Sequence, residues 1–204
     1  MYQIQIKLVG GPDKFYWENM IVLLVGRGQT ALNILEQYDY EDFHQSVVVA
    51  IEPLKEWYPC PNGLDDQVEA IEGLKYAVPQ LNKLIINLQN QFNLPRNKVA
   101  LVGFSAGAVM SLQLVSNSTE EFAGVVSHAG AILDPENLPQ AKNKTPILLI
   151  HAQDDDCFSW DERYLPMKKA LENQGYNLTV KESEFGGHYM SSSEAMDFLN
   201  QVIR

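Results

Sequence analysis

Short runs of almost uninterrupted apolar residues constrain the fold of this chain more than any other feature. Four of them cover residues 20–25, 46–51, 98–104 and 146–150, and residues 122–127 are similar. A strand is apolar throughout, rather than at alternate positions, when helices bury both of its faces, as they do in a parallel sheet. These runs therefore predict the central strands of a mostly parallel sheet.

Segments of helical period separate the apolar runs. In the clearest, apolar residues recur at steps of three and four from Leu64 to Leu88, and Pro79 is expected to kink or divide the helix. Shorter helices with the same period are predicted over residues 30–37, 106–116 and 159–173. Ser191 and Glu194 predict a capping box at the start of one more helix near the C-terminus.

The N-terminal segment has a different pattern. Apolar and polar residues alternate over residues 2–8, which predicts a half-exposed strand. Residues 10–13 then predict a turn, and residues 15–17 are expected to close an antiparallel hairpin. We therefore expect one α/β domain over residues 1–204: a mostly parallel central sheet with an N-terminal antiparallel edge hairpin and helices on both faces.

Net charge limits the expected partners of this chain, and cysteine content bears on its expected compartment. The chain has 15 Lys and Arg residues against 26 Asp and Glu residues, a net charge of −11. Such a field repels polyanions, so we expect no nucleic acid partner. No apolar run nears the length of a membrane span, so we also expect no stable membrane insertion. Cys60 and Cys157 cannot form a disulfide framework, and residues 1–14 lack the pattern of a signal peptide. These features predict a cytoplasmic protein, and they leave a homodimer open.

The motif Gly103-Phe104-Ser105-Ala106-Gly107 lies between a predicted strand and a predicted helix. A nucleophile at a tight strand-to-helix turn needs very small residues at both flanking positions. The N-terminus of the helix then stabilises the negative charge that develops during attack. Ser105 is therefore a candidate nucleophile, and a glycine-rich loop with an incidental serine is the alternative.

A serine hydroxyl needs a base and an acid that orients the base, in the chain order serine, acid, histidine. Three consecutive aspartates, at residues 154–156, follow the predicted strand 146–150, and His188 follows two glycines further on. His128 and His151 lie at predicted strand ends, where a structural hydrogen-bonding role is expected. Ser105, one of the aspartates and His188 therefore satisfy the order of a catalytic triad.

These motifs, together with Leu24-Val25-Gly26-Arg27-Gly28 and Trp57-Tyr58-Pro59, resemble the α/β-hydrolase fold. Within that fold they resemble the carboxylesterase, lysophospholipase and acyl-protein thioesterase group, from about Met20 to the C-terminus. The spacing from His151 makes Asp155 the triad acid by resemblance. The resemblance also implies that the backbone N–H groups of Arg27 and Ala106 form the oxyanion hole.

The resemblance has further implications for the site. Trp57 and Tyr58 correspond to a wall of the substrate pocket, although such aromatic pairs also pack beneath loops. The family usually has histidine where this chain has Val25, so a polar group behind the oxyanion loop is missing. The segment 129–144 is only as long as a loop, so we expect no lid domain.

The sequence thus predicts a carboxylic ester hydrolase. Its expected substrate is a small ester with a short to medium acyl chain, cleaved through an acyl-enzyme without a cofactor or a metal. An acyl-protein thioesterase or a lysophospholipase with the same triad is the alternative within this class.

A dinucleotide-binding domain is the alternative from another class. Gly26-Arg27-Gly28-Gln29-Thr30-Ala31 matches the glycine-rich fingerprint, and Glu52 ends the next apolar run. This interpretation leaves Ser105, Asp155 and His188 unexplained. A hydrolase-like binding module without activity is disfavoured because it need not retain all three residue types.

Overall fold

The structure, a computed structural model, describes residues 1–9, 16–40, 42–60 and 67–203. Its centre is a seven-stranded sheet in the order β1-β3-β2-β5-β6-β7-β8. The strands are β1 (Tyr2–Val9), β2 (Asn19–Leu24), β3 (Ser46–Pro53), β5 (Val99–Phe104), β6 (Gly124–His128), β7 (Pro146–Ala152) and β8 (Asn177–Ser183). The pairs from β3 through β8 are parallel, which confirms the predicted mostly parallel sheet.

β1 is the antiparallel edge strand that the alternating pattern predicts, but its partner differs from the expected one. Tyr2–Val9 pairs with β3 rather than with the residues that follow the predicted turn. An isolated two-stranded hairpin is marginally stable, whereas pairing with the buried β3 lets Tyr2, Ile4 and Val9 pack against the core. The predicted turn at residues 10–13 lies outside the described residues.

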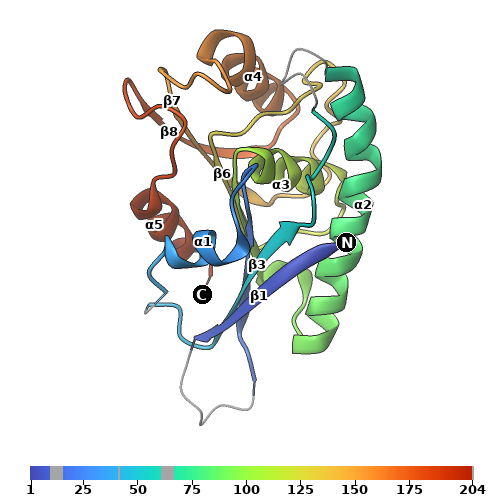
Figure 1. Cartoon of the computed structure of the whole chain (residues 1–204), viewed down its shortest axis with the longest axis vertical. Helices are drawn as coiled ribbons and strands as arrows, with labels where there is room; N and C mark the ends of the chain where they lie inside the picture. Colours follow the sequence, from blue (N-terminus) through green and yellow to red (C-terminus); the bar gives the residue numbers. More distant parts are fainter. Residues whose placement is uncertain (10–15, 41, 61–66, 204) are drawn as a thin grey trace.

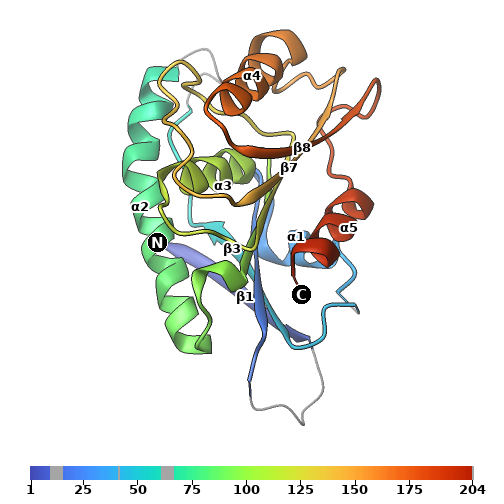
Figure 2. The same cartoon turned by 180° about the vertical axis from the view of Figure 1, so that it is seen from behind.

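Helices cover both faces of the sheet. They are α1 (Ala31–Glu36), α2 (Gln67–Phe92), α3 (Ala106–Asn117), α4 (Leu165–Asn173) and α5 (Ser192–Val202), with a 3₁₀ turn at Arg96–Lys98 and a π-helical turn at Trp160–Tyr164. α1 and α5 lie on one side of the sheet and α2 and α3 on the other, as the two opposite views show (Figures 1 and 2). None of the helices in the described ranges has the length and apolar content that crossing a membrane requires.

α2 continues through Pro79, so the expected division of this helix does not occur. Its buried side chains lie on both sides of the proline: Ala70, Leu74, Val78, Leu81, Ile85, Leu88 and Gln89. An interior proline costs about 3 kcal/mol, whereas burial of each large apolar side chain contributes about 1.5–3 kcal/mol. Packing against the core therefore outweighs the local cost. The predicted start of this helix, Leu64 with Asp65 and Asp66, lies outside the described residues.

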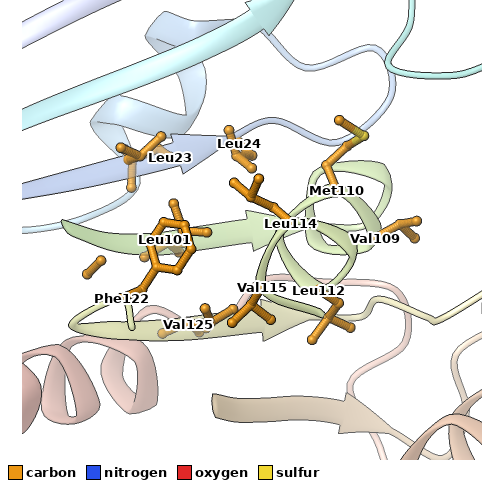
Figure 3. Packing of buried hydrophobic residues seen from close by; sticks show 14 of the residues in the cluster. Leu23, Leu24, Leu101, Val109, Met110, Leu112, Leu114, Val115, Phe122 and Val125 are labelled. Atoms are coloured by element: carbon orange, nitrogen blue, oxygen red, sulfur yellow. The ribbon is translucent and has the colours of Figure 1, made fainter. Parts of the chain in front are cut away.

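α3 packs against the middle of the sheet and contributes much of the core. Figure 3 shows its buried side chains beside Leu23 and Leu24 of β2, Leu101 of β5 and Val125 of β6. Because α3 begins two residues after β5 ends, this packing fixes the position of the connecting residue Ser105.

The predicted capping box of α5 is not formed. Ser191 is the N-cap residue, but its hydroxyl donates to the Glu194 carboxylate instead of accepting a bond from the helix backbone. A hydrogen bond to a charged acceptor is stronger than one between neutral groups, which explains the preference. Among the described residues, a capping box forms at α1, between Thr30 and Asn33.

Candidate active site

Ser105 occupies a strained turn between β5 and α3. Its φ of 53° and ψ of −118° are rare for a residue with a side chain. A Cβ atom at Gly103 would lie 2.3 Å from the Ser111 hydroxyl, and one at Gly107 would lie 2.1 Å from the Leu24 carbonyl. Both glycines are therefore required by the close approach of α3 to β2 and β5, and this approach holds Ser105 in the turn.

The structure brings Ser105, His188 and Asp155 into one hydrogen-bonded chain. His188 Nε2 lies 2.8 Å from Ser105 Oγ. On the other side of the ring, Nδ1 lies 2.9 Å from Asp155 Oδ2 and 3.0 Å from Oδ1. A carboxylate only accepts, so Nδ1 carries the ring hydrogen and Nε2 presents its lone pair to the Ser105 hydroxyl. This arrangement can remove the hydroxyl proton during attack.

The turn after β7 selects Asp155 among the three aspartates. Its side chain is buried, and Oδ1 accepts hydrogen bonds of 2.8 Å from the backbone amides of Cys157 and Phe158. Burial raises the pKa of this carboxyl, but the hydrogen bonds from His188 and from the two amides outweigh burial and keep the pKa below its usual value. Asp155 is therefore ionised at neutral pH.

Asp154 and Asp156 have different surroundings. Asp154 is exposed and accepts a 2.7 Å bond from the Gly187 amide, which ties the loop that carries His188 to the turn that carries Asp155. Asp156 is also exposed. The contact of Asp154 was missed in the sequence because nothing local indicates which loop lies opposite.

His151 and His128 have structural positions, as expected. His151 Nε2 donates to the Phe158 carbonyl at 2.8 Å, and its ring stacks on Tyr164 at 4.4 Å, which closes the turn around Asp155. His128 is fully buried, with Nε2 3.2 Å from the Tyr38 hydroxyl. Burial lowers the pKa of His128 to about 4, so this histidine is neutral at neutral pH.

The backbone amides of Arg27 and of Ala106, the residue that follows Ser105, are available to a ligand. Hydrogen bonds among the described residues leave both N–H groups without a protein acceptor, and Ala106 is the first residue of α3, where amides are unpaired. Both residues line a hollow of about 140 Å³. Trp57 and Tyr58 line the same hollow, and both are almost completely buried.

Two side chains hold the loop that carries the Arg27 amide. The indole N–H of Trp57 donates to the Val25 carbonyl at 2.7 Å, and the Gln29 carboxamide oxygen accepts from the Gly26 amide at 2.9 Å. These bonds supply support at the place where the family usually has a histidine. Gln29 was missed as a support of this loop because it is a variable position of the glycine-rich motif, which indicated only a dinucleotide-binding alternative.

Glu52 has a structural position rather than one suited to a dinucleotide. Its carboxylate accepts a 2.9 Å bond from the Ala31 amide at the start of α1. A dinucleotide fold needs this acidic group for a ribose hydroxyl. Glu52 is therefore not available for the ribose contact that the dinucleotide-binding alternative requires.

A second hollow, of about 420 Å³, lies beside His188. Its lining residues are Gln29, Gln37, Phe104, His188, Tyr189, Met190 and Ser192. The Phe104 ring lies 5.1 Å from the His188 ring, centre to centre. A larger cavity of about 620 Å³ lies between α2 and the end of α3, and none of the residues that line the second hollow lines it.

One group of side chains in the described residues could hold a metal ion. Asp155, Cys157 and His188 each place a ligand atom within 4.8 Å of the other two. Two of these residues also belong to the hydrogen-bonded chain of Ser105.

Comparisons with known proteins identify the family of the chain. The profile of the phospholipase/carboxylesterase family matches residues 44–204. Two curated proteins named acyl-protein thioesterase 1 are similar: the one from Debaryomyces hansenii is 29% identical over 155 residues and the one from Schizosaccharomyces pombe 27% over 144. The matches cover 70% and 69% of this chain but 64% of each relative, so the chain spans less than two thirds of their length.

Solved structures share the fold over the whole chain. The crystal structure of esterase PE8 has a TM-score of 0.86 at 24% identity, covering 100% of this chain and 98% of its own. The Bacillus cereus carboxylesterase has a TM-score of 0.80 at 18% identity, covering 99% and 95%. These likenesses confirm the predicted α/β-hydrolase fold.

Proposed function

The chain belongs to the phospholipase/carboxylesterase family, and on this premise we propose that it is a serine hydrolase for carboxylic esters of short to medium acyl chains. One observation carries the proposal: Ser105, His188 and Asp155, from three separate loops, meet with hydrogen bonds of 2.8 and 2.9 Å. An incidental serine or an exposed loop histidine would have no reason to form this chain of contacts.

The geometry supports a two-step acyl transfer. Ser105 Oγ attacks the acyl carbon while His188 Nε2 takes the hydroxyl proton, and Asp155 stabilises the imidazolium. The amides of Arg27 and Ala106 bind the oxyanion, and each such donor contributes about 10²- to 10³-fold to kcat. His188 then gives its proton to the leaving oxygen, and a water molecule, deprotonated by the same nitrogen, releases the acid from Ser105.

The position of the proton donor assigns the two sides of the substrate. The leaving oxygen receives its proton from His188 Nε2, so the alcohol part occupies the 420 Å³ hollow that His188 lines with Phe104. The carbonyl oxygen faces the oxyanion amides, and we propose that the acyl chain extends past them into the 140 Å³ hollow lined by Trp57 and Tyr58. The smaller volume on the acyl side favours a short chain.

Acyl-protein thioesterase activity is the second candidate, because both curated relatives carry that name. The same attack by Ser105 would expel a thiolate instead of an alcohol. A long fatty acyl chain would extend beyond the 140 Å³ hollow, which favours short esters. The ester hydrolase and the thioesterase are distinguished by measuring kcat/KM for butyryl and decanoyl substrates, each as the oxygen ester and as the thioester.

The test of the hydrolase is covalent labelling with a fluorophosphonate, followed by mass mapping of the adduct. We expect the adduct on Ser105, and we expect Ser105→Ala to lower hydrolysis of p-nitrophenyl butyrate by about 10⁴-fold while the unfolding temperature stays within a few degrees. More than a tenth of the wild-type turnover in a pure Ser105→Ala preparation would overturn the proposal.

We also propose the cytoplasm as the compartment of this protein. Cys60, which is buried, and Cys157, which is exposed, do not form a disulfide. A reducing compartment maintains such thiols. Fractionation of cells that express the natural gene, with an antibody to the protein, tests this assignment.

A further inference from the structure

Cys157 lies next to the proposed catalytic residues, but its thiol has no role in the proposed acyl transfer. Its backbone amide binds Asp155, while its side chain is exposed to solvent. The thiol sulfur, an Asp155 oxygen and a His188 ring nitrogen lie within 4.8 Å of one another. Three different ligand atoms therefore converge at a point that ions in solution can reach.

We propose that Asp155, Cys157 and His188 form an inhibitory binding site for Zn²⁺. Thiolate, imidazole and carboxylate are the three protein ligands that Zn²⁺ prefers, and three of them with one water complete its tetrahedral coordination. Hard cations such as Mg²⁺ select oxygen ligands and bind thiolates poorly. The inhibitory part of this inference rests on the proposed hydrolase function, whereas the binding part does not.

The contacts in the structure leave suitable atoms on Asp155 and His188. The Cys157 thiol, whose pKa is raised by burial and by Asp156 and Asp155, must exchange its hydrogen bond to Asp156 for the metal. Backbone amides occupy Asp155 Oδ1, so Oδ2 is the oxygen that can turn to a metal. Oδ2 and His188 Nδ1 are 2.9 Å apart. Ligands of a tetrahedral Zn²⁺ with bonds of about 2.0–2.3 Å stand about 3.3–3.8 Å from each other. The Oδ2–Nδ1 pair must therefore open by less than about 1 Å, while the thiol sulfur moves inward.

The charge of this region also favours a cation. Asp154 and Asp156 flank the triad acid, and the whole chain carries a net charge of −11. Such a field raises the local concentration of divalent cations. Binding then releases one proton from the Cys157 thiol to water, because the thiolate is the ligand.

Metal binding at Nδ1 would prevent the proton transfer from Ser105. In the triad described above, Nδ1 carries the ring hydrogen and Nε2 faces the hydroxyl at 2.8 Å. A metal needs the Nδ1 lone pair, so the single hydrogen of the neutral ring must reside on Nε2. Nε2 can then no longer accept the Ser105 proton, and the occupied enzyme is inactive.

Binding is measured first without reference to activity. Co²⁺ is titrated into the Ser105→Ala variant, in which all three ligands remain, and the near-ultraviolet absorption band of a thiolate bound to Co²⁺ is recorded. We expect this band in Ser105→Ala and its loss in Ser105→Ala with Cys157→Ser. The absence of the band, or its persistence after Cys157→Ser, would overturn the site.

Inhibition is measured next in the otherwise wild-type protein. We expect Zn²⁺ to inhibit hydrolysis, EDTA to restore it and Mg²⁺ to have no effect. The Zn²⁺ concentration that gives half-inhibition should be at least about tenfold higher for Cys157→Ser and for a second variant, Cys157→Ala, than for the wild type. For Cys60→Ala it should equal that of the wild type. Equal sensitivity of wild type and both Cys157 variants would overturn the inference. If no ester is hydrolysed, the proposed function fails, and the Co²⁺ band still decides the binding site.

Discussion

Replacing Asp155 with asparagine tests how His188 is oriented, because the change preserves shape and removes one acceptor. Asp155 Oδ1 accepts hydrogen bonds from the amides of Cys157 and Phe158, each at 2.8 Å. The asparagine carbonyl oxygen must take this position, since an NH₂ group there would face two donors. The NH₂ group then occupies the position of Oδ2, 2.9 Å from His188 Nδ1.

This NH₂ group changes the tautomer of His188. The carbonyl oxygen, 3.0 Å from Nδ1, already accepts from two amides, while the NH₂ group is the nearer neighbour of Nδ1. The lone pair on Nδ1 and the ring hydrogen on Nε2 are therefore favoured. The Ser105 hydroxyl then faces a donor that cannot take its proton. The same substitution lowers kcat by about 10⁴ in serine proteases, and at 1.36 kcal/mol for each tenfold this equals about 5 kcal/mol of transition-state stabilisation. KM should change little.

The assay is the steady-state hydrolysis of p-nitrophenyl butyrate, with Asp154→Asn and Asp156→Asn as matched controls. Asp154 accepts from the Gly187 amide at 2.7 Å, and asparagine keeps an acceptor oxygen there. Asp156 is exposed. Both controls should therefore lose less than about tenfold in kcat. The reasoning is refuted if Asp155→Asn stays within tenfold of the wild type, or if one of the controls is the inactive variant.

Three further predictions follow from single contacts. Gly107→Ala would place a Cβ atom 2.1 Å from the rigid Leu24 carbonyl, so the free energy of unfolding in urea should fall by about 3 kcal/mol; a loss below about 1 kcal/mol would contradict this packing. Trp57→Phe removes the bond to the Val25 carbonyl behind the oxyanion loop and should lower kcat about 10- to 100-fold; a change in KM alone would instead indicate a pocket wall. Burial lowers the pKa of His128 to about 4, so the unfolded chain, with a pKa of about 6.5, takes up the proton first as the pH falls. Stability from this group is full above about pH 7 and should decrease by about 3 kcal/mol between about pH 6.5 and 4; urea unfolding of wild type against His128→Asn measures the difference, which would be independent of pH if the assignment were wrong.

The order of the elements and the residue types of the site could be predicted from the sequence because both depend on local patterns. Apolar runs appear wherever a strand is buried on both faces, so β2, β3, β5, β6 and β7 were visible without coordinates. The turn at Ser105 requires glycines on both sides, and the sequence has them as Gly103 and Gly107. The order serine, acid, histidine along the chain then indicated an aspartate after residue 150 and His188 as the partners of Ser105.

Contacts between distant segments were decided only by the tertiary structure. The pairing of β1 with β3, the continuity of α2 through Pro79 and the bond from Trp57 to Val25 each depend on which surfaces meet, and no short pattern records that. The same holds for Asp155, which resemblance indicated but which only the two backbone amides and the His188 ring set apart from its neighbours. Local patterns specify elements because their energies arise within a few residues, whereas a site arises from side chains that only packing brings together.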